Sequence, residues 1–168
     1  MRIGLDLDNT IVCYDDVFQL IAKDLGLVSE TWTGDKAQVR SEIRSRPGGG
    51  LVWQRLQGQA YGKYMHRATL FPGVGNFLIR TKVRGDKIVI VSHKTEFGHH
   101  DSEQIPLRRE ALYWMRSHRF FDQTGFGLSE EDVFFEPSRK AKIRKIAELD
   151  CDLFIDDLRE VFAEPSFP

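Results

Sequence analysis

Four short apolar segments, each followed by polar residues, are the feature that most constrains the fold of this chain. They comprise residues 3–7, 87–91, 133–135 and 152–155. Between them lie stretches with apolar residues at helical spacing, at 15–25, 74–83, 107–118 and 137–149. Strands that alternate with helices pack as a mostly parallel sheet covered by those helices. The sequence therefore predicts an α/β fold.

The stretch 14–72 interrupts this alternation. It contains helical signals, one of them over 51–68, and no strand signal. A crossover helix with two short loops takes about 20 to 30 residues, so this stretch is too long to be a simple connection. We expect a core formed by residues 1–13 and 73–168, with a small helical cap inserted at 14–72.

The composition is that of an ordinary folded domain. The chain has 168 residues, a net charge of −1 and 41% hydrophobic residues. This charge balance does not favour a nucleic acid polymer or a membrane as partner. No apolar run approaches the roughly 20 residues that span a bilayer, and the first strand begins too early for a signal peptide. Cys13 and Cys151 have no metal-ligand spacing, so we expect buried free thiols and a cytoplasmic protein.

Polar side chains gather where three of the four predicted strands end. Asp6 and Asp8 follow the first strand, Ser92 follows the second, and Asp156 and Asp157 follow the fourth. The carboxyl ends of parallel strands share one edge of a sheet and form its ligand crevice. Residues far apart in the sequence are therefore expected to converge there.

Clustered carboxylates are costly unless a cation or a reaction uses them, and oxygen-only ligands suit Mg²⁺. A metal ion between Asp6 and Asp156 could also hold a phosphate oxygen, while Ser92 and a lysine hold the other phosphoryl oxygens. One carboxylate could then attack phosphorus. Its neighbour could donate a proton to the leaving oxygen and later activate water.

These residues resemble the four motifs of the haloacid dehalogenase-like (HAD) phosphohydrolases, in the same order along nearly the whole chain. The motif residues are Asp6-Leu7-Asp8-Asn9-Thr10, Ser92, Lys142 and Asp156-Asp157. The resemblance implies a Rossmann-like three-layer α/β/α core with a mostly parallel sheet. The inserted stretch 14–72 is similar to the family's C1-type cap.

The resemblance also implies roles for single residues. Asp6 is the expected nucleophile, Asp8 the general acid/base, and Lys142 the residue that steadies both the nucleophile and the phosphoryl group. The expected Mg²⁺ ligands are Asp6, Asp156, Asp157 and the main-chain carbonyl of Asp8. The expected substrate-binding and phosphate-binding set is Asn9, Thr10, Ser92, His93 and Lys94. Because the family's haloalkanoate dehalogenases lack the second acid of the first motif, Asp8 favours phosphoryl chemistry. We expect a Mg²⁺-dependent phosphatase that acts on a small phosphorylated metabolite through an aspartyl-phosphate on Asp6.

Some residues have alternative interpretations. Lys140 is the alternative to Lys142 as the motif lysine. His99-His100-Asp101 is interpreted as an exposed loop in preference to a metal site, because neighbouring loop residues rarely share a metal ion. In the family the chain continues after the last acid pair into a fifth strand, whereas Pro165 and Pro168 discourage one here.

Other functions are compatible with the same residues. A nucleotidase or a phosphotransferase would use the same scaffold. A phospho-acceptor signalling domain also combines acids, a hydroxyl and a lysine, but its acid pair comes first in the chain, whereas Asp156-Asp157 comes last. A non-hydrolytic binding protein is disfavoured by the intact motifs.

Overall fold

The structure is a computed structural model that describes residues 1–100 and 103–168. The described chain forms two compact units. The first unit comprises residues 1–12, 70–95 and 115–168, and the second comprises 13–69 and 96–114. The second unit thus groups 96–114 with most of the stretch that was expected as a cap. That this unit acts as a cap stays a prediction.

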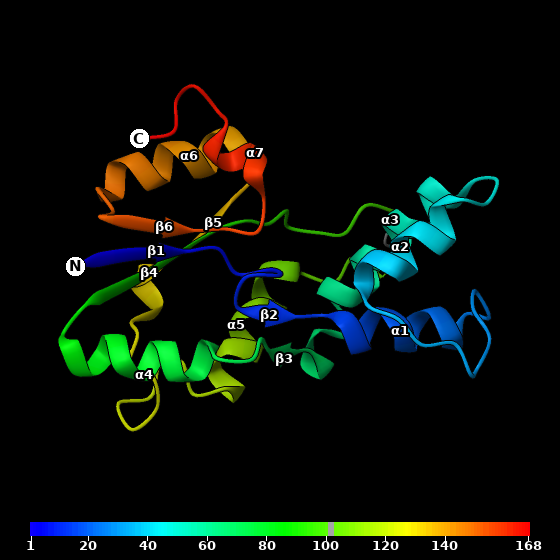
Figure 1. The fold of residues 1–168 in the computed structure, drawn as a ribbon, viewed down its shortest axis with the longest axis horizontal. Helices are drawn as coiled ribbons and strands as arrows, with labels where there is room; N and C mark the ends of the chain where they lie inside the picture. The colour runs from blue at the N-terminus through cyan, green and yellow to red at the C-terminus, as the bar shows by residue number, and fades with distance from the viewer. Residues whose placement is uncertain (101–102) are drawn as a thin grey trace. The chain divides into compact units, whose positions relative to one another are not determined.

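A four-stranded parallel sheet lies in the first unit (Figure 1). The strands are β1 (Arg2–Leu5), β4 (Lys87–His93), β5 (Val133–Glu136) and β6 (Leu153–Ile155). Their order is β5–β4–β1–β6, and each neighbouring pair is parallel. Leu5 pairs with both Ile90 of β4 and Ile155 of β6, so these three strands reach the carboxyl edge side by side. This sheet agrees with the arrangement predicted from the four apolar segments.

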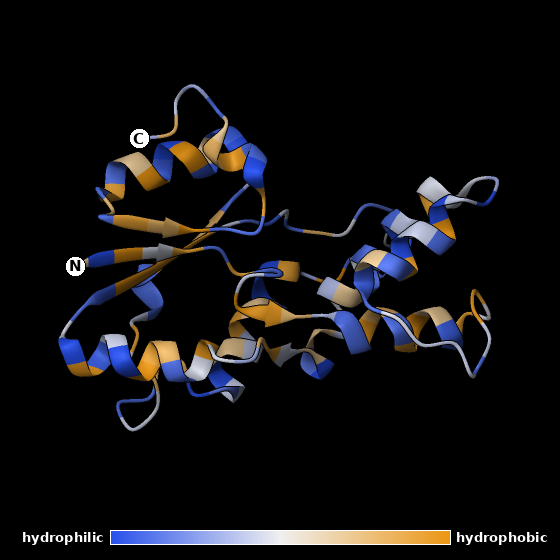
Figure 2. Cartoon of the chain, viewed as in Figure 1, coloured by the Kyte–Doolittle hydropathy of each residue, from blue (hydrophilic) through white to orange (hydrophobic). Residues whose placement is uncertain are grey.

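Burial on both faces explains the apolar character of the central strands. Ile3 and Leu5 of β1 and residues 89–91 of β4 are almost wholly buried, and these strands stand out as hydrophobic in Figure 2. A parallel sheet with helices on both faces requires such continuous apolar runs. Gly4 is the exception for a steric reason: a Cβ there would lie 2.4 Å from a ring carbon of Phe154 on the neighbouring strand.

Helices cover both faces of this sheet, with α6 (Arg139–Leu149) on one side and α4 (Val74–Arg84) on the other (Figure 1). Ile143 and Ile146 of α6 pack with Val91 of β4. The same cluster includes Val161 from the short helix α7 (Arg159–Phe162), which follows β6. A short 3-10 helix, η2 (Glu130–Asp132), precedes β5. The first unit is therefore a three-layer α/β/α structure.

The second unit is helical and packs around aromatic side chains. It contains α1 (Asp15–Asp24), α2 (Lys36–Arg44), α3 (Gly49–Tyr61), the 3-10 helix η1 (Met65–Arg67) and most of α5 (Leu107–Ser117). The rings of Phe18 and Trp53 are stacked at 4.9 Å, and Tyr14 meets Tyr61 edge-on at 4.9 Å. These contacts join α3 to the region of α1, as expected for aromatic pairs in a small core.

Two local predictions between residues 14 and 72 are wrong. No strand was expected there, but β3 (Thr69–Leu70) pairs with β2 (Val12–Cys13). A two-residue strand that depends on a distant partner leaves no periodic pattern in the sequence. The helix expected at 51–68 is α3 at Gly49–Tyr61, which ends before Gly62, and the separate 3-10 helix η1 follows it; Gly48, with a left-handed φ of 71°, precedes α3. A Cβ on Gly49 would lie 2.0 Å from the Ile43 carbonyl oxygen, so glycine is needed for this close approach.

The cysteines and the helix lengths bear on two expectations from the composition. Cys13 and Cys151 are free thiols as expected, but they are half-buried instead of buried, because Cys13 ends the short strand β2 and Cys151 precedes β6; partial burial raises the pKa of both. Among the described residues, no helix combines the length and apolar character needed to cross a membrane. The cytoplasmic location stays a prediction.

Candidate active site

Strand β1 and the turn after it hold the first two acids. Asp6 follows the last residue of β1, and its N–H donates to the Ile155 carbonyl at 2.9 Å, so the sheet itself fixes its backbone. The chain then turns, with the Ile11 N–H donating to the Leu7 carbonyl at 3.0 Å. Asn9 has a φ of 64°, a left-handed conformation that asparagine tolerates better than most residues. The backbone of Asp6 is thus fixed by the sheet, and Asp8 lies in the turn.

Lys142 joins the acids of the first and last strands. Its Nζ donates to Asp6 Oδ1 and to Asp156 Oδ2, each at 2.6 Å. Its side chain is 2% exposed, and those of Asp6 and Asp156 are 7% and 0% exposed. Lys142 lies in the first turn of α6, where its N–H donates to the Ser138 carbonyl at 2.9 Å. Lys140, the alternative motif lysine, is exposed on the same helix.

Three carboxylates offer oxygen atoms around one point. One oxygen each from Asp6, Asp156 and Asp157 lies within 4.8 Å of the others. The Leu158 N–H donates to Asp156 Oδ1 at 2.9 Å and so orients that carboxylate. Hard oxygen donors in this number are the ligands that Mg²⁺ prefers, with water completing its shell. The donor chemistry at this edge therefore fits the cation that the sequence suggested.

The electrostatics of Asp6 are unusual. Burial raises the pKa of its carboxyl to about 7, because the ionised form loses hydration. The neighbouring carboxylates of Asp8 and Asp156 raise the same pKa, and the Lys142 ammonium opposes them. A divalent cation beside the group would also favour the ionised form. Burial and the neighbouring acids therefore disfavour the ionised form of Asp6, which Lys142 and a divalent cation would favour.

The end of β4 brings a hydroxyl and a second lysine to the same edge. Ser92 is 1% exposed and comes two residues after Ile90, which pairs with Leu5 immediately before Asp6. Lys94 is also buried, and its Nζ lies 2.7 Å from Asp8 Oδ2. His93, between them, is exposed.

The remaining predicted residues have different environments. The hydroxyl oxygen of Thr10 is buried and has no hydrogen-bond partner among the described residues. Buried polar atoms are normally satisfied, so this hydroxyl is suited to a ligand oxygen. His99 and His100 are exposed. Asp101, the third residue of the alternative metal motif, lies outside the described residues.

Two features of the site were missed in the sequence. Lys94 was expected beside the phosphate, and its contact with Asp8 was not foreseen. The available signal was its position two residues after a buried strand segment, where a charged side chain needs a counter-charge. The bond from the Leu158 N–H to Asp156 was also missed, although Asp frequently accepts from the backbone two residues on.

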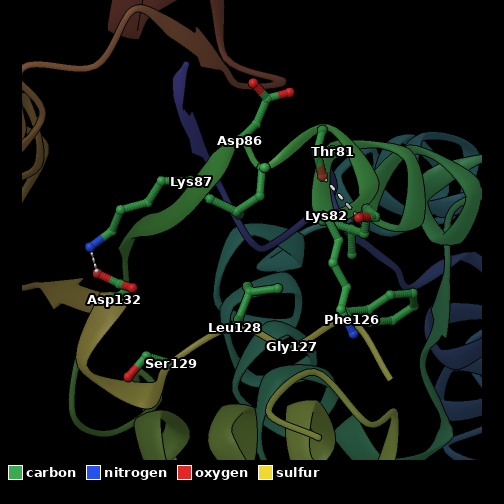
Figure 3. Close-up of a pocket in the computed structure, with 12 residues that line it drawn as sticks. Thr81, Lys82, Asp86, Lys87, Phe126, Gly127, Leu128, Ser129 and Asp132 are labelled. Atoms are coloured by element: carbon green, nitrogen blue, oxygen red, sulfur yellow. Dashed lines mark hydrogen bonds and ion pairs between the residues drawn. The ribbon is translucent and has the colours of Figure 1, made fainter. Parts of the chain in front are cut away.

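A hollow of about 330 Å³ lies in the same unit near the amino ends of β4 and β5, away from the acid cluster (Figure 3). Its charged side chains are already partnered: Lys87 and Asp132 form an ion pair at 2.8 Å, and Lys82 Nζ donates to the Gly125 carbonyl at 2.9 Å. Catalysis in α/β sheets takes place at the carboxyl ends of the strands. The acid cluster, at the carboxyl ends of the strands, is therefore the candidate site.

Comparisons with known proteins agree with this architecture. No family model and no curated protein matches the chain. Among solved structures, a haloacid dehalogenase-like family hydrolase from Streptococcus pneumoniae is similar, with a TM-score of 0.52 and 16% identity. The match covers 96% of this chain and 78% of that chain. The chain has the haloacid dehalogenase-like fold.

The HAD-like fold confirms the predicted α/β class with its mostly parallel sheet. An identity of 16% supports no more than the fold. The phosphohydrolase chemistry, the individual residue roles and the C1-type cap therefore stay predictions. They are argued below from the residues themselves.

Proposed function

We propose that this protein hydrolyses a small-molecule phosphomonoester in a Mg²⁺-dependent reaction that passes through an aspartyl-phosphate on Asp6. The observation that carries the proposal is the buried Lys142 ammonium, bonded at 2.6 Å to both Asp6 and Asp156. This ammonium group holds the Asp6 carboxylate, at the end of the central strand β1, beside carboxylate oxygens that suit a divalent cation. A fixed, buried carboxylate with a cationic partner is suited to act as a nucleophile.

Asp6, Asp156, Asp157 and the main-chain carbonyl of Asp8 are the proposed ligands of the cation. When bound, the cation would supply positive charge that offsets the charge of the phosphoryl oxygens. Lys142 contributes further positive charge from the protein itself. Ser92 and Thr10 are proposed to donate hydrogen bonds to phosphoryl oxygens. Asn9 and His93, their neighbours in the sequence, are also proposed members of the phosphate-binding set. The buried Thr10 hydroxyl without a partner among the described residues supports this role.

The reaction has two steps. In the first, an Asp6 carboxylate oxygen bonds to phosphorus as the bond to the leaving oxygen breaks, and Asp8 gives that oxygen a proton. In the second, Asp8 takes a proton from water as the water oxygen attacks the same phosphorus atom, which releases inorganic phosphate and restores Asp6. Each proton that Asp8 gives is thus recovered, as general acid/base catalysis requires.

The raised pKa of Asp6 is compatible with this chemistry. Attack on phosphorus requires the ionised carboxylate, which burial disfavours. Lys142 and a bound divalent cation both favour the ionised form. Ionisation of the nucleophile is therefore expected to depend on the cation.

The direct test measures phosphate release by the wild type and by Asp6→Asn. The substrates are a panel of sugar phosphates, nucleotides and other phosphorylated metabolites, each assayed with and without Mg²⁺. We expect Mg²⁺-dependent phosphate release by the wild type and a loss on the order of 10³-fold or more in Asp6→Asn. Asp24→Asn, which changes an exposed acid at the end of α1, is the matched control and keeps full activity. Near-normal turnover in a folded Asp6→Asn protein would contradict the assignment.

The same panel separates the alternatives. Turnover confined to nucleotides would indicate a nucleotidase, and transfer to an acceptor other than water would indicate a phosphotransferase. A stable phosphoryl group on Asp6 without turnover would indicate a phospho-acceptor. Because Asp8 is the proposed base that activates water, we expect phosphate release and no stable phosphoprotein.

A further inference from the structure

The acid that follows Asp6 in the first motif has its own buried cation. Lys94 Nζ lies 2.7 Å from Asp8 Oδ2, with the lysine side chain 2% exposed and that of Asp8 15% exposed. Burying an ammonium group costs several kcal/mol unless an opposite charge compensates. Lys94 is thus placed where its charge faces the proposed acid/base.

The two buried lysines contact different acids. Lys142 contacts Asp6 and Asp156, whereas Lys94 contacts Asp8. Asp6 and Asp8 are only two residues apart, and each has a buried lysine as an ion-pair partner, Lys142 at 2.6 Å and Lys94 at 2.7 Å. The two proposed catalytic acids therefore do not depend on one lysine alone.

The backbone holds Lys94 firmly. Its N–H donates to the Glu136 carbonyl at 3.0 Å, which continues the β4–β5 ladder beyond the His93–Glu136 pair. The backbone around Asp8 is held as well: Asp8 forms a β-bridge with Val12, and the Asn9 N–H donates to the Val12 carbonyl at 2.9 Å. Both partners of the ion pair are therefore anchored through their backbones, and the contact between their side chains sets where the Asp8 carboxylate points.

From these contacts we infer that Lys94 is a positioning residue that holds the Asp8 carboxylate in the orientation needed for proton transfer to the leaving group. This role replaces the phosphate-binding role that the sequence suggested for Lys94. It rests on the proposed phosphatase function, because it concerns a step of that reaction.

The role has a specific kinetic consequence. An alkyl phosphate has a leaving oxygen that needs a proton as its bond to phosphorus breaks, and Asp8 supplies it. The nitrophenolate ion of p-nitrophenyl phosphate leaves without one. Loss of Asp8 positioning is therefore expected to slow the first step, phosphoryl transfer to Asp6, selectively for the alkyl substrate; hydrolysis of the aspartyl-phosphate is the same step for both substrates. A phosphate ligand would affect both substrates equally, because both have the same phosphoryl group.

The test compares Lys94→Met and Lys94→Arg with the wild type on an alkyl phosphomonoester that the wild type turns over and on p-nitrophenyl phosphate. In Lys94→Met we expect kcat/KM for the alkyl substrate, which reports the steps up to formation of the aspartyl-phosphate, to fall by about tenfold or more, within the range of general acid catalysis. The kcat/KM for p-nitrophenyl phosphate should change by less than about threefold, because its leaving group needs no proton. Lys94→Arg, which keeps the cation, should recover part of the lost rate. Lys87→Met, at the other end of β4 and in an exposed ion pair, is the matched control.

A double variant keeps the test independent of small folding defects. If Lys94 acts through Asp8, Lys94→Met should cause no further loss of alkyl phosphate turnover in an Asp8→Asn background. An additive loss, or an equal fall in kcat/KM for both substrates, would overturn the positioning role while the phosphatase function stands. No turnover of either substrate by the wild type would overturn the proposed function, and this role with it.

Discussion

At the scale of single residues, Asp6 combines burial with a charged neighbourhood. It is 5% exposed, and its carboxyl faces Lys142 at 2.6 Å, with Asp8 and Asp156 nearby. Burial dominates, so the pKa is raised despite the lysine. A residue held in this state costs folding stability, which is typical of groups that serve chemistry.

The raised pKa of Asp6 predicts that the stability of the fold depends on pH. Because the pKa of Asp6 rises from 3.8 to about 7 on folding, the folded state holds a proton that the unfolded state releases between these values. The free energy of unfolding should therefore fall as pH rises through this window, by up to about 1.4 kcal/mol per pH unit for one proton. Asp6→Asn lacks this contribution, so its stability relative to the wild type should increase with pH. Urea unfolding of both proteins with chelator present measures this, and parallel pH profiles would contradict it.

At the scale of elements, β1 and α6 deliver the two ends of the Asp6–Lys142 bond. Ser138 caps α6, with its Oγ accepting from the Ala141 N–H at 3.2 Å, and so fixes where the first turn begins. Phe154 of β6 fills the space above Gly4, and its ring centroid lies 5.6 Å from Lys142 Nζ. A glycine in β1 therefore allows the ring to lie beneath the lysine.

Gly4→Ala should therefore destabilise the protein. The added Cβ would lie 2.4 Å from Phe154 Cδ2 and 3.1 Å from Cys151 Sγ, so the ring has to move. We expect a loss of about 1 to 3 kcal/mol in the free energy of unfolding, as is typical of overpacked cores. Gly50→Ala is the matched control, because nothing lies within 4 Å of its new methyl group in α3, and it should be neutral or stabilising. Equal stabilities of the two variants would refute this packing account.

At the scale of the whole molecule, the site forms only when segments from near the two ends of the chain come together. Lys142 and Asp6 are 136 residues apart, and β1 pairs with β6 near the end of the sequence. The acid cluster therefore exists only when the central sheet is complete. A ligand that binds only this assembled site stabilises the folded protein by mass action.

Mg²⁺ should consequently raise the melting temperature. At a concentration about 100-fold above its dissociation constant, we expect an increase of about 5 to 10 °C, from the linkage of binding to unfolding in a chain of this size. Asp157→Asn should reduce the shift, because Asp157 is an exposed member of the cluster whose replacement leaves the core intact. Asp24→Asn should keep the full shift. An unchanged melting temperature of the wild type in a scanning calorimeter would rule out a magnesium site of useful affinity.

The sequence by itself determined the order of the main elements, the parallel sheet and the edge where Asp6, Asp8, Ser92 and Asp156 gather. These features follow from local apolar patterns and from the rule that parallel strands end together. Only the tertiary structure decided that Lys142 is buried against two acids while Lys140 is exposed, and that Lys94 faces Asp8. Such choices depend on side-chain packing between residues far apart in the chain, as do the β2–β3 pair and the grouping of 96–114 with the helical unit. No local pattern encodes them, because their energies arise only when the distant partners meet.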